Sequence, residues 1–303
     1  MSLLTADGLS RAYGKTKALI DAGFDIGERR CIALLGPNGT GKTTALNLLA
    51  GLLEPTSGRI TAKKGLAADR RSWMGFLPQH PAFFGWMTGR ETMVAAGRLC
   101  GLSAAEAARR SDELLEAAGL RDAENRRVSG YSGGMKQRLG LAQAVVHSPR
   151  LLLLDEPVSA LDPIGRRDVL AMLKEWKKEM AIVLSTHVLH DAEQACDELI
   201  LMDKGRVVLQ GQMDELREAA GRPFLKVEVE EDETSLRWLG SLERFPGVRQ
   251  AEGGPNLRNL QTDDIGAVRD GVLRSALAAG AKLRTFEVAR KSLEQWFLEA
   301  VGR

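Results

Sequence analysis

The sequence predicts an α/β protein: a parallel β-sheet covered by helices, followed by a small α+β domain. Three short apolar runs carry the first prediction, namely CIALL at 31–35, LLLL at 151–154 and AIVL at 181–184. Continuous apolar runs of this length are typical of strands buried on both faces of a parallel sheet. From about residue 219 the pattern changes to strands and helices in the order β-α-β-β-α-β, which is the ferredoxin-like order.

Composition excludes several classes of function. The 303 residues carry a net charge of only +2, so the chain lacks the basic footprint of a nucleic-acid-binding protein and we expect no nucleic-acid partner. Neither a signal peptide nor an apolar run of roughly 18 residues is present. We therefore expect a cytoplasmic chain that reaches a membrane only through a partner. The three cysteines, Cys31, Cys100 and Cys196, lack metal-ligand spacing and suit a reducing compartment.

The first element of the predicted sheet, 31–35, leads into a glycine-rich loop and then a helix that closes near Gly51. The loop reads GPNGTGKT and matches G-x-x-x-x-G-K-[ST] between a strand and a helix, which is the context that this phosphate-binding motif requires. Its backbone N–H groups wrap phosphates, Lys42 reaches the β and γ phosphates, and Thr43 offers a hydroxyl to magnesium. The predicted phosphate-binding residues are Gly36, Pro37, Asn38, Gly39, Thr40, Gly41, Lys42, Thr43 and Thr44.

A helical segment is predicted next, over 88–127. Thr88 is a helix cap, and Ser103 with Glu106 forms a capping box. After this segment, Ser132, Gly133 and Gly134 open another helix. A helix N-terminus of this kind favours negative charge, so the chain carries a second predicted phosphate site.

Polar residues follow the other two apolar strands. Asp155 and Glu156 end the second strand, and His187 follows the third. Because ligands bind beyond the carboxyl ends of parallel strands, these residues should meet the phosphate loop. Asp155 then suits magnesium and Glu156 suits an attacking water. From the residues alone, an equal alternative is that the strand simply ends at Asp155 and Glu156 and leaves both carboxylates solvated. A lone histidine such as His187 is more often structural than catalytic. Gln79, from composition alone, is only a loop residue.

The region after residue 219 contains no visible catalytic cluster. A strand is predicted at 223–231, a hairpin turn at 253–256 and a helix C-cap at Gly280. The last helix is predicted to begin with a capping box of Ser292 and Gln295 and to bury Trp296, Phe297 and Val301.

Taken in order, these motifs resemble the nucleotide-binding subunit of an ABC transporter over about residues 3–218. The resemblance assigns Walker A to 36–43, the Q-loop glutamine to Gln79, the signature segment to Tyr131–Met135, Walker B to Asp155 and Glu156, the D-loop to Ser159–Asp162 and the switch histidine to His187. It also assigns adenine stacking to Tyr13, which from its residues alone would be an ordinary strand-end tyrosine. The signature departs from the family, where Leu and Gln usually stand in place of Tyr131 and Met135.

The resemblance implies a P-loop NTPase of the ABC ATPase type at 1–218, with a helical insert at about 88–145, and an accessory domain at 219–303. Its implied catalytic residues are Lys42, Gln79, Glu156 and His187, and its implied magnesium ligands are Thr43, Gln79 and Asp155. ATP would be bound by Tyr13, the phosphate loop and Asp162. Ser132, Gly133 and Gly134 would contact ATP held by a second ATPase subunit, in a homodimer or in a heterodimer with a paralogue.

The function implied is the ATP-hydrolysing subunit of an exporter, peripheral on the cytoplasmic face of the membrane and bound to a separate multi-spanning permease. TGRET at 88–92 and SLEQWF at 292–297 favour the exporter type, and the aromatic segment 81–89 either docks the permease or packs on the neighbouring helices. One alternative is a non-transport ABC ATPase acting on ribosomes or DNA. Another is a P-loop small-molecule kinase, which leaves the signature segment, the D-loop and His187 unexplained.

Overall fold

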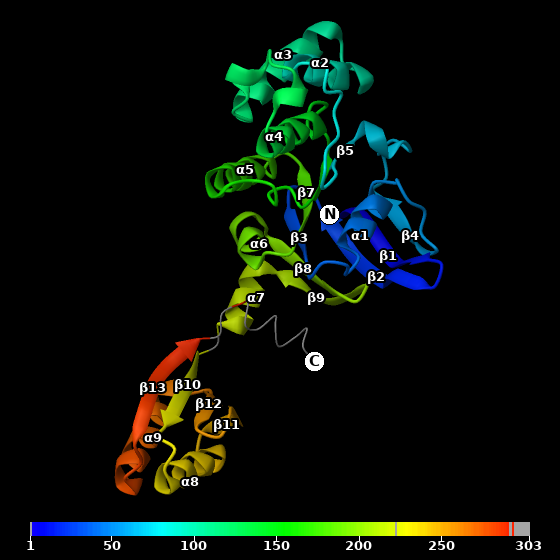
Figure 1. Ribbon diagram of the computed structural model, residues 1–303. Helices are drawn as coiled ribbons and strands as arrows, with labels where there is room; N and C mark the ends of the chain where they lie inside the picture. Colours follow the sequence, from blue (N-terminus) through cyan, green and yellow to red (C-terminus); the bar gives the residue numbers. More distant parts are fainter. Residues whose placement is uncertain (1, 222, 291–292, 294–303) are drawn as a thin grey trace. The chain divides into compact units, whose positions relative to one another are not determined.

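The structure is a computed structural model that describes residues 2–221, 223–290 and 293. It divides into two compact units, 1–213 and 214–303 (Figure 1). The predicted last helix, with Ser292, Gln295, Trp296, Phe297 and Val301, lies outside the described residues.

A six-stranded sheet forms the centre of the first unit, in the order β5-β6-β7-β3-β8-β9. Its first five strands are parallel and β9 pairs antiparallel with β8. The bounds are β5 (Met74–Leu77), β6 (Leu151–Asp155), β7 (Ala181–Thr186), β3 (Cys31–Leu35), β8 (Glu198–Asp203) and β9 (Arg206–Gln212). The three strands predicted from apolar runs are confirmed, and they are adjacent in the sheet.

Helices join the parallel strands, and a second sheet packs beside them. The joining helices are α1 (Lys42–Leu49), α4 (Gly133–Ala144), α5 (Pro163–Trp176) and α6 (Leu189–Ala195). The second sheet has the order β2-β1-β4, with β1 (Ser2–Tyr13), β2 (Thr16–Gly27) and β4 (Ser57–Ala62). Side chains of β1, β2, β3 and α1 share one buried cluster, which fixes the phosphate loop between the two sheets.

The helical segment predicted after residue 88 contains α2 (Gly89–Leu99) and α3 (Ala104–Ala117) (Figure 1). Both helices begin with a capping box: Thr88 with Glu91, and Ser103 with Glu106. The described residues also form four short 3-10 helices, at Arg70–Ser72, Arg121–Ala123, Val128–Gly130 and Leu242–Arg244.

The second unit contains a four-stranded antiparallel sheet in the order β11-β12-β10-β13. Its elements are β10 (Pro223–Val229), α8 (Glu233–Ser241), β11 (Val248–Glu252), β12 (Leu257–Thr262), α9 (Ile265–Ala279) and β13 (Leu283–Arg290), and α7 (Met213–Ala220) precedes them. This is the predicted β-α-β-β-α-β order. Gly280 ends α9 with a φ of 67°, as predicted, because glycine adopts the left-handed conformation without a steric penalty.

Candidate functional site

The phosphate loop follows β3 directly, and its backbone requires glycine. Gly41 has a φ of 100°, and a Cβ atom there would lie 2.3 Å from the carbonyl oxygen of Ala18. Gly39 has a φ of 81° and open space around it. The loop is therefore a cradle whose backbone stays accessible to a ligand, while Thr40 closes it with a 2.9 Å hydrogen bond from its hydroxyl to the Pro37 carbonyl.

Lys42 extends back over this loop from the start of α1. Its Nζ donates hydrogen bonds of 2.7 Å to the Gly36 carbonyl and 2.9 Å to the Pro37 carbonyl. Burial lowers the pKa of Lys42, and the Glu156 and Asp155 carboxylates oppose this shift by favouring the charged ammonium. The Lys42 ammonium therefore interacts with both carboxylates, although it comes from α1 and they lie at the end of β6.

Ser185 joins the two carboxylate residues at the end of β6. Its hydroxyl donates a 2.6 Å hydrogen bond to Oδ1 of Asp155 and accepts a 2.9 Å hydrogen bond from the backbone N–H of Glu156. Asp155 is only 2% exposed, so the alternative of a solvated strand end is wrong for this residue. Ser185 was not predicted as a site residue, because its two partners lie 30 and 29 residues earlier in the chain.

His187 contacts Glu156 directly: its Nδ1 lies 3.1 Å from Oε1 of the carboxylate. Glu156 has a φ of 47°, the left-handed region that a residue with a side chain seldom adopts. Strained backbone of this kind persists only where surrounding contacts hold it, and it is common at functional sites. The hydrogen bond from the Glu156 N–H to the Ser185 hydroxyl and the contact with His187 are two such contacts.

The residues predicted to hold magnesium supply oxygen atoms only: the Asp155 carboxylate, the Thr43 hydroxyl and the Gln79 amide. This donor set fits Mg²⁺, which prefers oxygen ligands and is usually held by one or two carboxylates together with substrate phosphates. Among the described residues no group of three or more His, Cys, Asp or Glu side chains could hold a metal. Thr43 and Gln79 are exposed at the surface, so a nucleotide could share a cation with them.

The signature segment lies at the start of α4. Ser132 caps α4, and its hydroxyl accepts a 3.2 Å hydrogen bond from the N–H of Met135. This helix start and the D-loop together line a cavity of about 440 Å³, and in the D-loop Asp162 caps α5 by accepting from the N–H of Gly165. Within the described part of the chain, no hydrogen bond or ion pair joins Ser132, Gly133 or Gly134 to Lys42 or Glu156.

Tyr131 and Gln137 anchor the signature segment through two contacts that were not predicted from the sequence. The Tyr131 hydroxyl donates a 2.8 Å hydrogen bond to the Ala123 carbonyl, and burial raises the pKa of this hydroxyl. Gly89 is needed beside it, because a Cβ there would lie 2.2 Å from the Tyr131 oxygen. Gln137 donates a 3.1 Å hydrogen bond to the Pro157 carbonyl and so ties α4 to the chain that follows Glu156.

A buried ion pair joins the two helices that follow the D-loop and His187. Arg166 of α5 donates two hydrogen bonds to Asp191 of α6, at 2.6 and 2.5 Å. The Asp191 side chain is 2% exposed and the Arg166 side chain 35%. Arg166 lies four positions after Asp162, and Asp191 lies four positions after His187. The ion pair therefore connects the chain that carries Asp162 to the chain that carries His187.

Tyr13, predicted to stack on adenine, is nearly half exposed at the end of β1. The Arg11 guanidinium lies 4.9 Å from the centre of its ring, which is the geometry of a cation–π contact.

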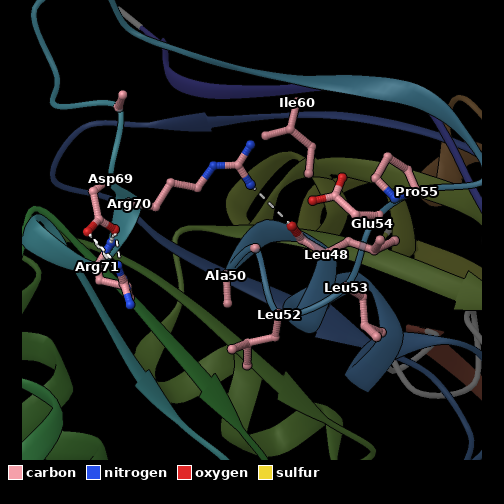
Figure 2. Close-up of a pocket in the computed structure, with 12 residues that line it drawn as sticks. Leu48, Ala50, Leu52, Leu53, Glu54, Pro55, Ile60, Asp69, Arg70 and Arg71 are labelled. Carbon is pink, nitrogen blue, oxygen red and sulfur yellow. Dashed lines mark hydrogen bonds and ion pairs between the residues drawn. The ribbon is translucent and has the colours of Figure 1, made fainter.

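A larger cavity, of about 560 Å³, lies at the carboxyl end of α1 (Figure 2), and none of the candidate site residues lines it. Arg70 reaches across it and donates to the carbonyls of Leu48 and Leu49 at 3.3 and 3.2 Å. The last carbonyls of a helix lack ordinary helical partners, and although the Leu48 carbonyl also accepts from the N–H of Gly51, the arginine adds a positively charged cap to the end of α1.

Comparison with known proteins decides the family. Residues 19–159 match the ABC transporter family model. The chain is 44% identical to an uncharacterized ABC transporter ATP-binding protein, YxlF, of Bacillus subtilis (strain 168), over 99% of each chain. It is 36% identical to the doxorubicin resistance ATP-binding protein DrrA of Mycobacterium tuberculosis, over 97% of this chain and 92% of that one.

The chain belongs to the ATP-binding proteins of ABC transporters. It is therefore an ABC ATPase, which binds and hydrolyses ATP. Its fold matches the ATP-binding subunit of an ABC transporter with a TM-score of 0.65 and 33% identity, over 72% of this chain and 93% of that one. It also matches a dimeric ATP-binding cassette in a post-hydrolysis state with ADP and Pi, with a TM-score of 0.63 and 25% identity, over 69% and 98% of the two chains.

The second of these structures is a dimer of ATP-binding cassettes. In the described part of the chain, no helix is long and apolar enough to cross a membrane.

Proposed function

We propose that this ABC ATPase drives export through a separate permease, from the cytoplasmic face of the membrane. The observation that carries the proposal is the grouping of Lys42, Asp155, Glu156 and His187 at one edge of the sheet, with His187 3.1 Å from Glu156. The drug-resistance names of several relatives, including DrrA, support the direction of transport.

In this proposal water attacks the γ-phosphate of ATP in line with the bond to the leaving ADP. Glu156 orients the water, and His187 holds the Glu156 carboxylate and reaches the γ-phosphate. Lys42 stabilises the charge that develops on the phosphate oxygens once its two carbonyl hydrogen bonds are exchanged for phosphate contacts. Magnesium, held by Asp155, Thr43 and Gln79, would supply further charge stabilisation.

Each ATP is shared between two copies in the proposed assembly. Among the described residues, no hydrogen bond or ion pair joins Ser132, Gly133 or Gly134 to Lys42, and this supports sharing of each ATP between two copies. Ser132, Gly133 and Gly134 of one copy would contact the γ-phosphate bound by the other. A homodimer is the simplest form, and Asp162 beside the same cavity would lie at the dimer interface.

The substitution Glu156→Gln tests the site. We expect it to abolish ATP hydrolysis while keeping ATP binding, so that the variant forms a stable dimer in ATP and a monomer in ADP. Light scattering in each nucleotide measures this, and Glu175→Gln, at an exposed carboxylate paired with Lys178, is the matched control. A Glu156→Gln chain that stays monomeric in both nucleotides would contradict the shared site.

The permease is proposed to dock on the aromatic segment that follows Gln79. Phe84 and Trp86 are 68% and 70% exposed, with ring centres 5.8 Å apart. A cavity of about 390 Å³ lies nearby, between β5, the chain at Pro81 and the ends of α2 and α4. Exposed aromatic side chains beside a hollow are typical of an interaction surface, and these two follow Gln79 closely in the chain.

Serine substitutions at Phe84 and Trp86 test this docking. We expect the double variant to keep its ATP binding and to lose co-purification with its membrane protein from detergent extracts, since large apolar contacts carry most of the binding energy at interfaces. Leu52→Ser, at another exposed apolar residue, is the control. If the double variant still co-purified at equal amount, the permease would dock elsewhere.

A further inference from the structure

Two cysteines that are 165 residues apart in the chain meet inside the first unit. The Sγ atoms of Cys31 and Cys196 lie 3.2 Å apart, and both side chains are buried. Cys31 begins β3, and Cys196 directly follows α6, with Asp197 between it and β8. Asp197 fixes the backbone here: its carboxylate accepts from the N–H of Cys31 at 3.0 Å, and its own N–H donates to the Cys31 carbonyl at 2.8 Å.

We propose that Cys31 and Cys196 are an oxidation site, which a small peroxide converts from two thiols to a disulfide. A disulfide bond is about 2.05 Å long, so each sulfur has to move only about 0.6 Å from its present place. The hydrogen bonds to Asp197 involve the Cys31 backbone, so a movement of the sulfurs does not by itself break them. In the reduced fold the two sulfurs are therefore about 1.2 Å from bonding distance.

The oxidant is a peroxide, and the reaction balances with hydrogen peroxide. One thiolate attacks a peroxide oxygen, the O–O bond breaks, and a sulfenic acid forms with release of one water after proton transfer. The second sulfur attacks the sulfenic sulfur, the S–S bond forms, and the S–O bond breaks to release a second water. Two thiols are oxidised, and one peroxide is reduced to two waters.

The burial of the two sulfurs determines which oxidants can reach them. Both sulfurs are buried, so a bulky disulfide such as oxidised glutathione cannot reach them. Burial also raises the pKa of the Cys196 thiol, which keeps most of it protonated and makes the first step slow. Cys100 lies at the surface and gives an internal comparison, because both large and small reagents can reach it.

The expected consequence is a more stable fold with its ATPase site intact. The bond would tie the start of β3 to the chain between α6 and β8, and it would close a loop of 165 residues. In the chain-entropy account, a crosslink that closes a long loop stabilises the fold most. The phosphate loop follows the opposite end of β3, so the geometry around Lys42 is unaffected.

Peptide mapping of the full chain after treatment with hydrogen peroxide tests the proposal, in the Cys100→Ser variant. We expect a disulfide-linked pair of peptides containing Cys31 and Cys196, about 2 Da lighter than the two reduced peptides together. We also expect the melting temperature to rise by about 5–10 °C and to return to its initial value with reductant. Cys196→Ala in the same background, also treated with peroxide, should show neither change.

Two results would overturn the proposal. In one, Cys31 and Cys196 both react with iodoacetamide after denaturation, although the exposed Cys100 of the unsubstituted chain has been oxidised under the same conditions. In the other, either cysteine is converted to a sulfinic acid without a linked peptide. Both results come from the unsubstituted chain or the Cys100→Ser variant, so neither depends on the folding of a variant in the buried pair.

Discussion

Tyr131 stands where a leucine is usual in the family, and its hydroxyl supplies a contact that leucine cannot make. The 2.8 Å hydrogen bond to the Ala123 carbonyl joins the signature segment to the chain after α3. The buried hydroxyl also excludes any side chain at position 89, so the two residues depend on each other. A substitution at one of them therefore has to be judged together with the other.

The variant Tyr131→Phe should lower the free energy of unfolding by about 1 kcal/mol, because the Ala123 carbonyl loses its hydrogen bond in a buried place. Urea denaturation measures this difference. Tyr13→Phe is the matched control and should show no measurable change, since Tyr13 is nearly half exposed. Equal stability of Tyr131→Phe and the natural chain would mean that water replaces the lost hydroxyl.

Among the elements, α5 and α6 are held together by an ion pair that the sequence does not reveal. Arg166→Ala leaves the Asp191 carboxylate buried without its partner. We expect a loss of about 2–3 kcal/mol in unfolding free energy, below the value for a fully buried pair because Arg166 is one-third exposed. Arg237→Ala, which removes an exposed pair with Glu233, is the control.

A kinetic measurement separates positioning from stability in the same variant. If α5 and α6 also fix Asp162 and His187, Arg166→Ala should lower kcat at temperatures where the variant is fully folded, with a smaller change in KM for ATP. A variant that is less stable but has an unchanged kcat would limit the pair to a structural role.

Local patterns predicted most of the elements. The apolar runs of β3, β6 and β7, the Thr88 cap of α2, the capping box of α3, and the turn before β12 are each readable from a few consecutive residues. The β2-β1-β4 sheet was not predicted, because its strands pair across several register shifts that blur their alternation.

The candidate site was only partly accessible to sequence reasoning. The phosphate loop and the strand-end residues form local motifs, and the structure brings Lys42, Asp155, Glu156 and His187 together. Their chemical roles stay predictions. The bridge through Ser185, the Arg166–Asp191 pair and the contact of Cys31 with Cys196 join residues far apart in the chain, so no local pattern encodes them.

At the scale of the whole molecule, sharing of ATP predicts that two inactive variants can complement each other. Lys42→Ala removes the charge at one phosphate site. Gly133→Glu adds a negative charge at the other, where the structure leaves open space and where an acidic residue suits the start of a helix. Each variant alone should be inactive, whereas a mixed dimer contains one undamaged shared site.

Random mixing of equal amounts leaves about a quarter of all shared sites undamaged, because half of the dimers are mixed and each has one such site. Phosphate release by the mixture should therefore rise well above that of either variant, up to about a quarter of the natural rate if the two sites act independently. No gain on mixing would contradict a site built from two copies.

The place of β3 in the sheet has a consequence for how the protein is made. The neighbours of β3 are β7 and β8, and both are encoded about 150 residues after it. At ribosomal speeds of about 5–20 residues per second, the strand that carries the phosphate loop waits on the order of 10 s for its partners. The nascent chain therefore emerges with an unpaired apolar strand, and it can bind nucleotide only when most of the first unit has been synthesised.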